Sequence, residues 1–180
     1  VGLEGEGALS FDGVGDYVDL GNASIMNNLL AGAGLIQFRF GITPASVSGD
    51  YIVIFNIVAV GIMVAINNGQ MRITGRSISD ETLREATGGT IAIGNYYDVR
   101  VDLDFAGGQI RIYINDETTP VVTKNISWSR STYTPAWFSQ DYTWIGNHKT
   151  ANRNYSGIIH YLNIKTDGDL VFDMPLDEGT

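Results

Sequence analysis

Apolar and polar residues alternate between positions 97 and 115, and the alternation is interrupted at Gly107-Gly108. A period of two places successive side chains on opposite faces of a strand, so each half predicts a strand with one buried face. The glycine pair predicts a tight hairpin turn. In that register Phe105 lies opposite Ile110 and Asp104 lies opposite Arg111, so that acid meets base on the polar face.

The same pattern recurs between positions 62 and 73, around Asn68-Gly69. Asn-Gly favours a tight hairpin because both turn residues readily adopt positive φ. The register predicted by this turn sets Ile66 opposite Met71 and Val64 opposite Ile73.

Further short runs predict strands, and glycine or other turn residues separate most of them. Ala23–Leu30 is the one helix candidate. Many short strands with little helix predict an all-β fold, a two-sheet antiparallel β-sandwich. The other expected strands are Ala8–Asp12, Tyr17–Leu20, Leu35–Ile42, Tyr51–Ile57, Ile91–Ile93, Val121–Ile126, Thr143–Ile145, Ile158–Lys165 and Leu170–Met174, the last two joined at Asp167-Gly168.

Composition limits the functions that this fold could carry. The chain has 180 residues, a hydrophobic content of 44% and no cysteine, which fits one domain with its own core and excludes disulfides and thiol chemistry. The formal charge of -9 would repel nucleic acid and suits neutral glycans and cations better. The most apolar stretch, 51–66, is too short to cross a membrane. We therefore expect neither nucleic-acid binding nor membrane insertion.

Five segments carry a further signal, and they occur in this order: Ala8–Leu20 (ALSFDGVGDYVDL), Asn95–Val101 (NYYDVRV), Ile110–Asp116 (IRIYIND), Ile145-Gly146 and Tyr155–Ile159 (YSGII). Together they resemble the laminin-G-like, concanavalin A-like lectin superfamily. The resemblance implies a single jelly-roll domain over residues 1–180. The chain begins with valine and has no signal peptide, so we expect it to be a piece of a larger protein. This fold hosts lectins, adhesion modules, hydrolases and lyases, so it implies no single activity.

One departure from the family pattern bears on function. The family often carries an acidic pair after the position of Ile159, where this chain has His160 and Tyr161. Functions that depend on those acids are therefore not expected. His148 and His160 are the only histidines, and the motifs of alginate-lyase-like members are missing around both. We interpret His160, in a mixed strand, as a core residue.

Glycosidase chemistry needs two carboxylates placed across the scissile bond. The Glu-x-Asp-x-x-Glu run of laminarinase-like members is absent, and the nearest acidic positions, Asp98, Asp102 and Asp104, are interrupted by Arg100. We interpret these acids as a solvated face paired with Arg111. The chain is therefore predicted not to be an enzyme.

Asp12 and Asp16 flank a glycine-rich turn and are candidate Ca²⁺ ligands. Calcium prefers six to eight hard oxygen ligands, so this turn would be an incomplete site. The alternative interpretation is that both carboxylates cap the turn by accepting backbone N–H bonds. Ca²⁺ is the only cofactor that the sequence suggests, and none is required.

Aromatic residues gather between positions 128 and 155, which include every tryptophan of the chain. Sugars stack on aromatic rings while amide and guanidinium groups bond their hydroxyls, as in a mostly apolar ligand site with a few fixed polar groups. The alternative is that these rings fill the core, which we favour for Trp144. The candidate ligand-binding residues are Trp128, Tyr133, Trp137, Tyr142, His148, Asn152, Arg153 and Tyr155.

The sequence therefore predicts a noncatalytic carbohydrate-binding or adhesion module of a secreted, cell-surface or phage virion protein. Its expected partner is a glycan or cell-surface polysaccharide, together with other subunits where it is part of a larger assembly. Two alternatives stay open. One is a structural or oligomerisation module of a particle or fibre with no ligand. The other is a polysaccharide-degrading hydrolase or lyase with an unrecognised site.

Overall fold

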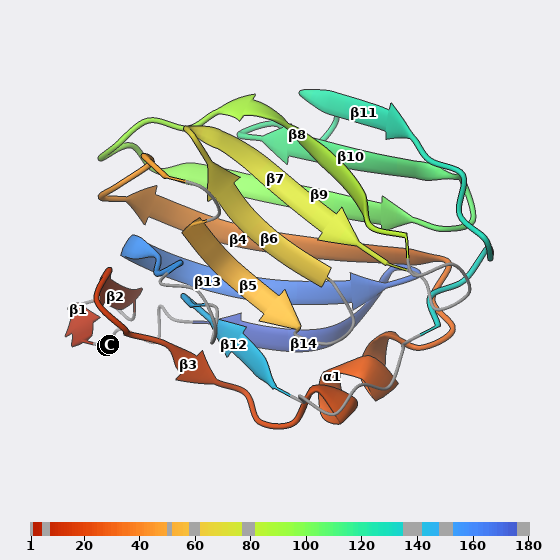
Figure 1. Cartoon of the computed structure of the whole chain (residues 1–180), viewed down its shortest axis with the longest axis horizontal. Coiled ribbons are helices and arrows are strands. Elements are labelled where there is room, and N and C mark those ends of the chain that lie inside the picture. Colours follow the sequence, from red (N-terminus) through yellow and green to blue (C-terminus); the bar gives the residue numbers. More distant parts are fainter. Residues whose placement is uncertain are drawn as a thin grey trace.

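The structure is a computed structural model that describes residues 2–4, 8–49, 52–57, 62–76, 82–134, 142–147 and 153–175. Two antiparallel sheets, one of eight strands and one of six, stack face to face (Figure 1). One short helix, α1, lies at the rim of this sandwich. The all-β, two-sheet jelly-roll prediction is confirmed.

The eight-stranded sheet has the order β1-β2-β13-β4-β9-β10-β11, and β14 also pairs with β13. β2 and β14 share one side of β13, because β2 pairs with residues 156–159 of β13 and β14 with residues 161–166. The strands are β1 (Gly2–Glu4), β2 (Ala8–Asp12), β4 (Leu35–Pro44), β9 (Tyr97–Asp104), β10 (Gln109–Ile114), β11 (Val122–Asn125), β13 (Ser156–Thr166) and β14 (Asp169–Pro175).

The six-stranded sheet has the order β3-β12-β5-β6-β7-β8. Its strands are β3 (Val18–Asp19), β12 (Thr143–Ile145), β5 (Ile52–Ile57), β6 (Ile62–Asn67), β7 (Gln70–Gly75) and β8 (Arg84–Thr90). The helix α1 (Ala23–Leu30) lies where the sequence predicts it. The side chain of Asn22 caps its start by accepting a bond of 2.7 Å from the Ser24 N–H.

The core lies between the sheets and is built from the apolar half of each alternating strand. Phe38 of β4 and Phe55 of β5 meet across it with ring centroids 5.2 Å apart. Met26 and Leu30 add the apolar side of α1 to the same cluster. In the described part of the chain, no helix has the length and apolar character needed to cross a bilayer.

The β6–β7 hairpin has the predicted register. Ile66 pairs with Met71, Val64 pairs with Ile73, and Asn68-Gly69 adopts positive φ angles of 47° and 74°. The Asp167-Gly168 turn between β13 and β14 is confirmed in the same way, with φ angles of 51° and 98°.

The predicted β9–β10 register is wrong by two residues. Asp104 pairs with Gln109, and Arg111 lies opposite Asp102, so the turn spans Phe105–Gly108. Phe105 leaves the ladder because its N–H bonds the Gly34 carbonyl (2.8 Å) while its ring packs in the core. A shift of two residues keeps every side chain on its predicted face, so the predicted inward and outward faces of both strands are correct.

The strand β8 is missing from the sequence prediction, which places a strand at Ile91–Ile93 instead. Its sequence, REATGGT, has no apolar alternation. Gly88 and Gly89 adopt positive φ, and a Cβ at either residue would collide with Val122 or Ile114 of the other sheet. These glycines let β8 approach β10 and β11 closely, which closes the sandwich at that edge.

Candidate functional site

The face of the eight-stranded sheet that points away from the core, called here the outer face, carries the polar half of each alternating strand. On the corresponding face of the six-stranded sheet, the described residues Val53, Ala65 and Thr74 are almost fully buried. Polar side chains on rigid strands are found on the outer face, while the six-stranded sheet carries the Arg72–Glu85 ion pair. The outer-face members on the four central strands are Gln37, Arg39, Thr43, Asp98, Arg100, Asp102, Asp104, Arg111, Tyr113, His160, Tyr161, Asn163 and Lys165.

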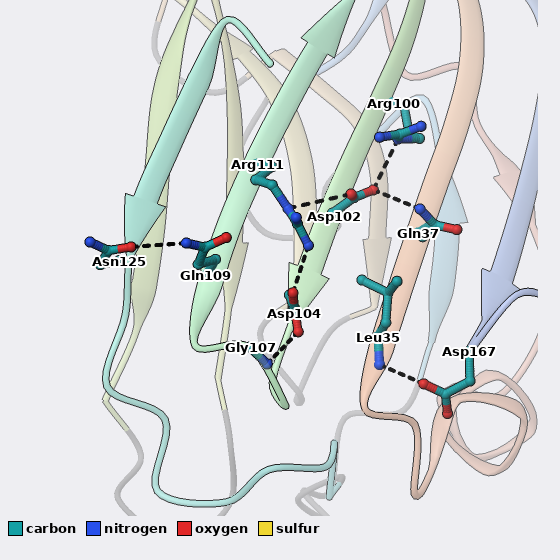
Figure 2. A network of polar contacts seen from close by, with 10 residues as sticks. All are labelled: Leu35, Gln37, Arg100, Asp102, Asp104, Gly107, Gln109, Arg111, Asn125 and Asp167. Carbon is teal, nitrogen blue, oxygen red and sulfur yellow. Dashed lines mark hydrogen bonds and ion pairs between the residues drawn. The ribbon is translucent and has the colours of Figure 1, made fainter. Parts of the chain in front are cut away.

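A network of arginines and aspartates fills one part of the outer face (Figure 2). Asp102, only 2% exposed, lies at its centre. Its Oδ1 accepts a bond from Gln37 (3.1 Å) and lies 3.2 Å from the Arg100 Nε, while its Oδ2 lies 3.7 Å from the Arg111 Nε. Arg111 also bonds Asp104 at 2.6 Å. The predicted pairing with Arg111 is confirmed for Asp102 and Asp104. It is wrong for Asp98, which pairs with Arg39, and the prediction of a solvated face is wrong for the buried Asp102.

Burial and the two arginines act in opposite directions on Asp102. Burial raises the pKa of the Asp102 carboxyl above its usual value, although Arg100 and Gln37 favour its ionised form. The Arg100 guanidinium also lies over the Tyr113 ring, 3.7 Å from its centroid. Each arginine and aspartate in this network pairs with a residue of opposite charge, which suits a structural role.

A β-bulge in β13 shapes the other part of the outer face. Ile159 pairs with Ile42 and Tyr161 pairs with Gly41, so His160 is an extra residue with no partner position on β4. Ile159 and Leu162 both lie in the core. The bulge therefore places two adjacent side chains, His160 and Tyr161, on the outer face, where strict alternation would allow one.

These two side chains join a set that we call the tyrosine–histidine cluster: Arg39, Thr43, Tyr96, Asp98, His160 and Tyr161. Arg39 donates two hydrogen bonds to Asp98, from Nε to Oδ1 at 3.1 Å and from Nη2 to Oδ2 at 2.6 Å. The Tyr161 hydroxyl donates to Asp98 Oδ1 at 2.6 Å. Burial and this bond to a carboxylate raise the pKa of Tyr161, so its hydroxyl stays a donor at neutral pH.

His160 lies beside this pair on the outer face. Its Nε2 is 3.0 Å from the Thr43 hydroxyl, and its ring meets the Tyr96 ring edge-on at 5.1 Å. Burial lowers the pKa of His160 below its usual value, so the imidazole is neutral at pH 7. The interpretation of His160 as a core residue is wrong, because the bulge turns it outward.

Gly41 makes room for the two tyrosines. A Cβ at this position would lie 2.8 Å from Cε1 of Tyr161 and 3.0 Å from the Tyr96 hydroxyl. Tyr96 is 51% exposed, although it touches His160. The cluster thus offers solvent an aromatic ring next to an imidazole, with hydroxyl, guanidinium and carboxylate groups fixed around it.

Three of the predicted ligand-binding aromatics are buried, and two of them, Tyr133 and Tyr155, belong to the core. Tyr133 is 1% exposed and donates its hydroxyl to Asn27 at 3.3 Å, and Tyr155 is fully buried and donates to the Ile158 carbonyl at 3.1 Å. Tyr142 is 5% exposed and packs on Trp144. These predictions need correction, because a ring enclosed on all sides cannot stack on a sugar. A sandwich of this size needs such large rings to fill its ends.

The other predicted residues divide into described and undescribed positions. Trp128 is half-buried against the Phe105 ring, with centroids 4.4 Å apart, and Arg153 is half-buried beside β5. Trp137, His148 and Asn152 lie outside the described residues. Their ligand role stays a prediction. Trp144 is only 8% exposed, but it packs on Tyr17 and Tyr142 outside the core cluster to which its neighbour Ile145 belongs.

Asp12 and Asp16 use carboxylate oxygens to hold their own turn. Asp12 Oδ1 accepts from the Val14 N–H at 2.6 Å, and Asp16 Oδ2 accepts from the Asp12 N–H at 3.0 Å. This geometry fits the turn-capping alternative. Within the described ranges no three acidic or histidine side chains gather as a metal site. Calcium binding at this turn stays a prediction.

No family model and no curated protein matches this sequence. Solved structures match its fold. The CBM40 domain of the Ruminococcus gnavus IT-sialidase, bound to α2,3-sialyllactose, has a TM-score of 0.67 at 11% identity, covering 92% of this chain and 91% of that one. Domain 4 of AbnA, an extracellular GH43 arabinanase of Geobacillus stearothermophilus in complex with arabinotriose, has a TM-score of 0.60 at 12% identity, covering 96% and 74%. Mouse laminin α1 domains LG4-5 have a TM-score of 0.58 at 9% identity, covering 96% and 45%.

The chain thus has a jelly-roll fold similar to that of concanavalin A-like and laminin-G-like domains. Its structural neighbours are mostly carbohydrate-binding modules and lectin-like domains. At these identities the likeness establishes the fold, and the residues of the outer face must carry the argument about function.

Proposed function

We propose that this domain is a noncatalytic carbohydrate-binding module and that the tyrosine–histidine cluster on the outer face is its glycan site. The observation that carries the proposal is the half-exposed Tyr96 ring, set beside His160 on a rigid sheet. An exposed ring flanked by oriented polar groups is what a sugar needs, because the ring packs on C–H groups while the polar groups bond hydroxyls. The glycan-bound structural neighbours agree with this proposal.

The polar groups of the cluster fit binding better than catalysis. Asp98, the acid in the cluster, is held by Arg39 and Tyr161, and Asp102 is buried. Two carboxylates that face one another across a bond, as glycoside hydrolysis needs, are not found among the described outer-face residues. A location in a secreted, cell-surface or virion protein suits a glycan-binding role and belongs to the same proposal.

The test is glycan binding by the purified domain and by three variants. We expect Tyr96→Ala to weaken binding by about 1–3 kcal/mol, by analogy with bases stacked on aromatic side chains. Tyr17→Ala is the matched control, because Tyr17 is also partly exposed (42%) but stacks on Trp144 of the other sheet. Trp137→Ala tests the region predicted from sequence alone.

The pattern of affinities among the variants shows where on the domain the glycan binds. Loss of affinity in Tyr96→Ala, with Tyr17→Ala unchanged, supports the outer-face site. Loss only in Trp137→Ala moves the site to the 128–155 region and refutes the cluster. If the folded domain binds no glycan, the structural or oligomerisation alternative replaces the binding proposal.

A further inference from the structure

The arginine charges on the central strands of the outer face are neutralised by carboxylates of the protein. Among the described residues of these strands, every arginine has at least one such partner. The pairs are Arg39 with Asp98 and Glu117, Arg100 with Asp102, and Arg111 with Asp102 and Asp104.

The pairing at Arg39 matters most, because this arginine belongs to the tyrosine–histidine cluster. Its two bonds to Asp98 occupy one side of the guanidinium group, and Glu117 takes up further donor capacity. Carboxylates of acidic sugars are bound best by an arginine that presents two free, parallel N–H groups. At Nε and Nη2 an acidic sugar would have to displace Asp98 or Glu117.

The remaining charged or titratable groups near the cluster add no positive charge beside the Tyr96 ring. His160 is neutral at pH 7. Lys165 is on the same face but pairs across from Gln37, whereas Tyr161 pairs across from Gly41. Four residues along a strand span about 13 Å, so Lys165 lies well away from the Tyr96 ring. The cluster therefore offers hydrogen bonds and an aromatic surface with no uncompensated positive charge.

We infer that the outer-face site selects uncharged glycans and discriminates against sialylated and uronic-acid glycans. This inference rests on the proposed function. It separates this chain from its structural neighbour with bound sialyllactose, although the two share a fold. The selectivity has a specific cause, which is the pairing of the Arg39 Nε and Nη2 groups with Asp98 and Glu117.

That cause can be tested by removing one of the two carboxylates. Glu117 is the better choice because its side chain is 61% exposed, so Glu117→Gln should leave the fold intact. Asp169→Asn is the control, since Asp169 is exposed at the start of β14 and the substitution makes the same change in net charge. The uncharged probes are lactose, arabinotriose and cellotetraose. The acidic probes are α2,3-sialyllactose and tetragalacturonic acid, each measured by calorimetry at pH 7.5.

We expect the parent domain to bind at least one uncharged probe and to bind both acidic probes at least tenfold more weakly. Glu117→Gln should tighten binding of an acidic probe by about tenfold, the scale of one charge-assisted hydrogen bond, while Asp169→Asn should not. Equal or stronger binding of an acidic probe by the parent domain overturns the inference and leaves the proposed function standing. An unchanged preference for uncharged over acidic probes in Glu117→Gln also overturns the inference and leaves the proposed function standing. Binding of neither kind of probe by the folded domain overturns both.

Discussion

Asp98 and Asp102 lie four residues apart on β9 and face the same side of the sheet, yet we expect their removal to have opposite consequences. The perturbation is Asp→Asn at each position, which deletes the negative charge and keeps the shape. For Asp102→Asn we expect stability at pH 7 within about 1 kcal/mol of the parent, or above it, because burial already disfavours the charge of this carboxyl. For Asp98→Asn we expect a loss of about 2 kcal/mol.

The small cost at Asp102 follows from the positions of its two oxygens. Oδ1 takes both close contacts, from Gln37 (3.1 Å) and from the Arg100 Nε (3.2 Å), and the Asn oxygen can take its place. Oδ2 has only the Arg111 Nε at 3.7 Å, beyond hydrogen-bond range, so an amide NH₂ fits there. Burial raises the pKa of Asp102, which means that the folded state disfavours its charge at pH 7. Asn removes that penalty.

The larger expected loss of stability in Asp98→Asn arises from hydrogen bonds to both carboxylate oxygens. Both oxygens are used: Oδ1 accepts from Tyr161 and from the Arg39 Nε, and Oδ2 accepts from the Arg39 Nη2 at 2.6 Å. Burial alone would raise the pKa of Asp98, but the bonds from Arg39 and Tyr161 outweigh it and lower the pKa. In Asp98→Asn the amide NH₂ points at the Arg39 donor, so one charge-assisted bond, worth about 1.5–3 kcal/mol, becomes a repulsion.

Urea unfolding followed by tryptophan fluorescence measures the difference, provided that the slope m is the same for all three proteins. The lowered pKa of Asp98 adds stability that is present above its unfolded value of 3.8 and is lost as the pH falls through the folded value. The advantage of the parent over Asp98→Asn should therefore shrink in acid. An Asp102→Asn variant that loses more than about 2 kcal/mol, or as much as Asp98→Asn, would refute this account of the network.

Three further predictions concern the sites themselves. Gly41→Ala should keep the fold but weaken glycan binding, because its Cβ would lie 2.8 Å from the Tyr161 ring and displace the cluster; circular dichroism and calorimetry separate the two effects. The lowered pKa of His160 disfavours its protonation in the folded state, so the parent should lose more stability than His160→Gln as the pH falls below about 6.5, as measured by urea unfolding at pH 7.5 and 5. Calcium held at the Asp12–Asp16 turn would raise the melting temperature in excess calcium over that in chelator by mass action, whereas equal values would leave turn capping as the role of these carboxylates.

Alternation and turn residues predict the sandwich because both act locally. The register of β6–β7 follows from Asn68-Gly69, where the turn and the apolar pattern specify the same pairing. The register of β9–β10 could not be predicted in this way, since Phe105 is drawn out of the ladder by the Gly34 carbonyl, far away in sequence. β8 was missed for a similar reason, because its glycines are selected by contacts with Val122 and Ile114 on the opposite sheet.

The candidate site was hidden from sequence reasoning by a different cause. The density of aromatic residues between positions 128 and 155 predicted ligand-binding rings there. Two of those rings, Tyr133 and Tyr155, are buried in the core. Aromatic content alone does not distinguish a ring that fills a core from a ring that meets a sugar. The distinction depends on exposure, and exposure at the cluster depends on the bulge at His160, which no periodic pattern shows.

The bulge is also the feature on which the proposed ligand preference depends. The sandwich places β13, β4 and β9 side by side in the eight-stranded sheet. One inserted residue then decides that both His160 and Tyr161 point outward, and Gly41 opposite Tyr161 gives the two tyrosine rings the space that they need. Tyr161 in turn holds Asp98 against Arg39, which cancels the charge that an acidic sugar would seek. Ligand selectivity in this fold can therefore change through a bulge and a glycine, with the strand order and the core left as they are.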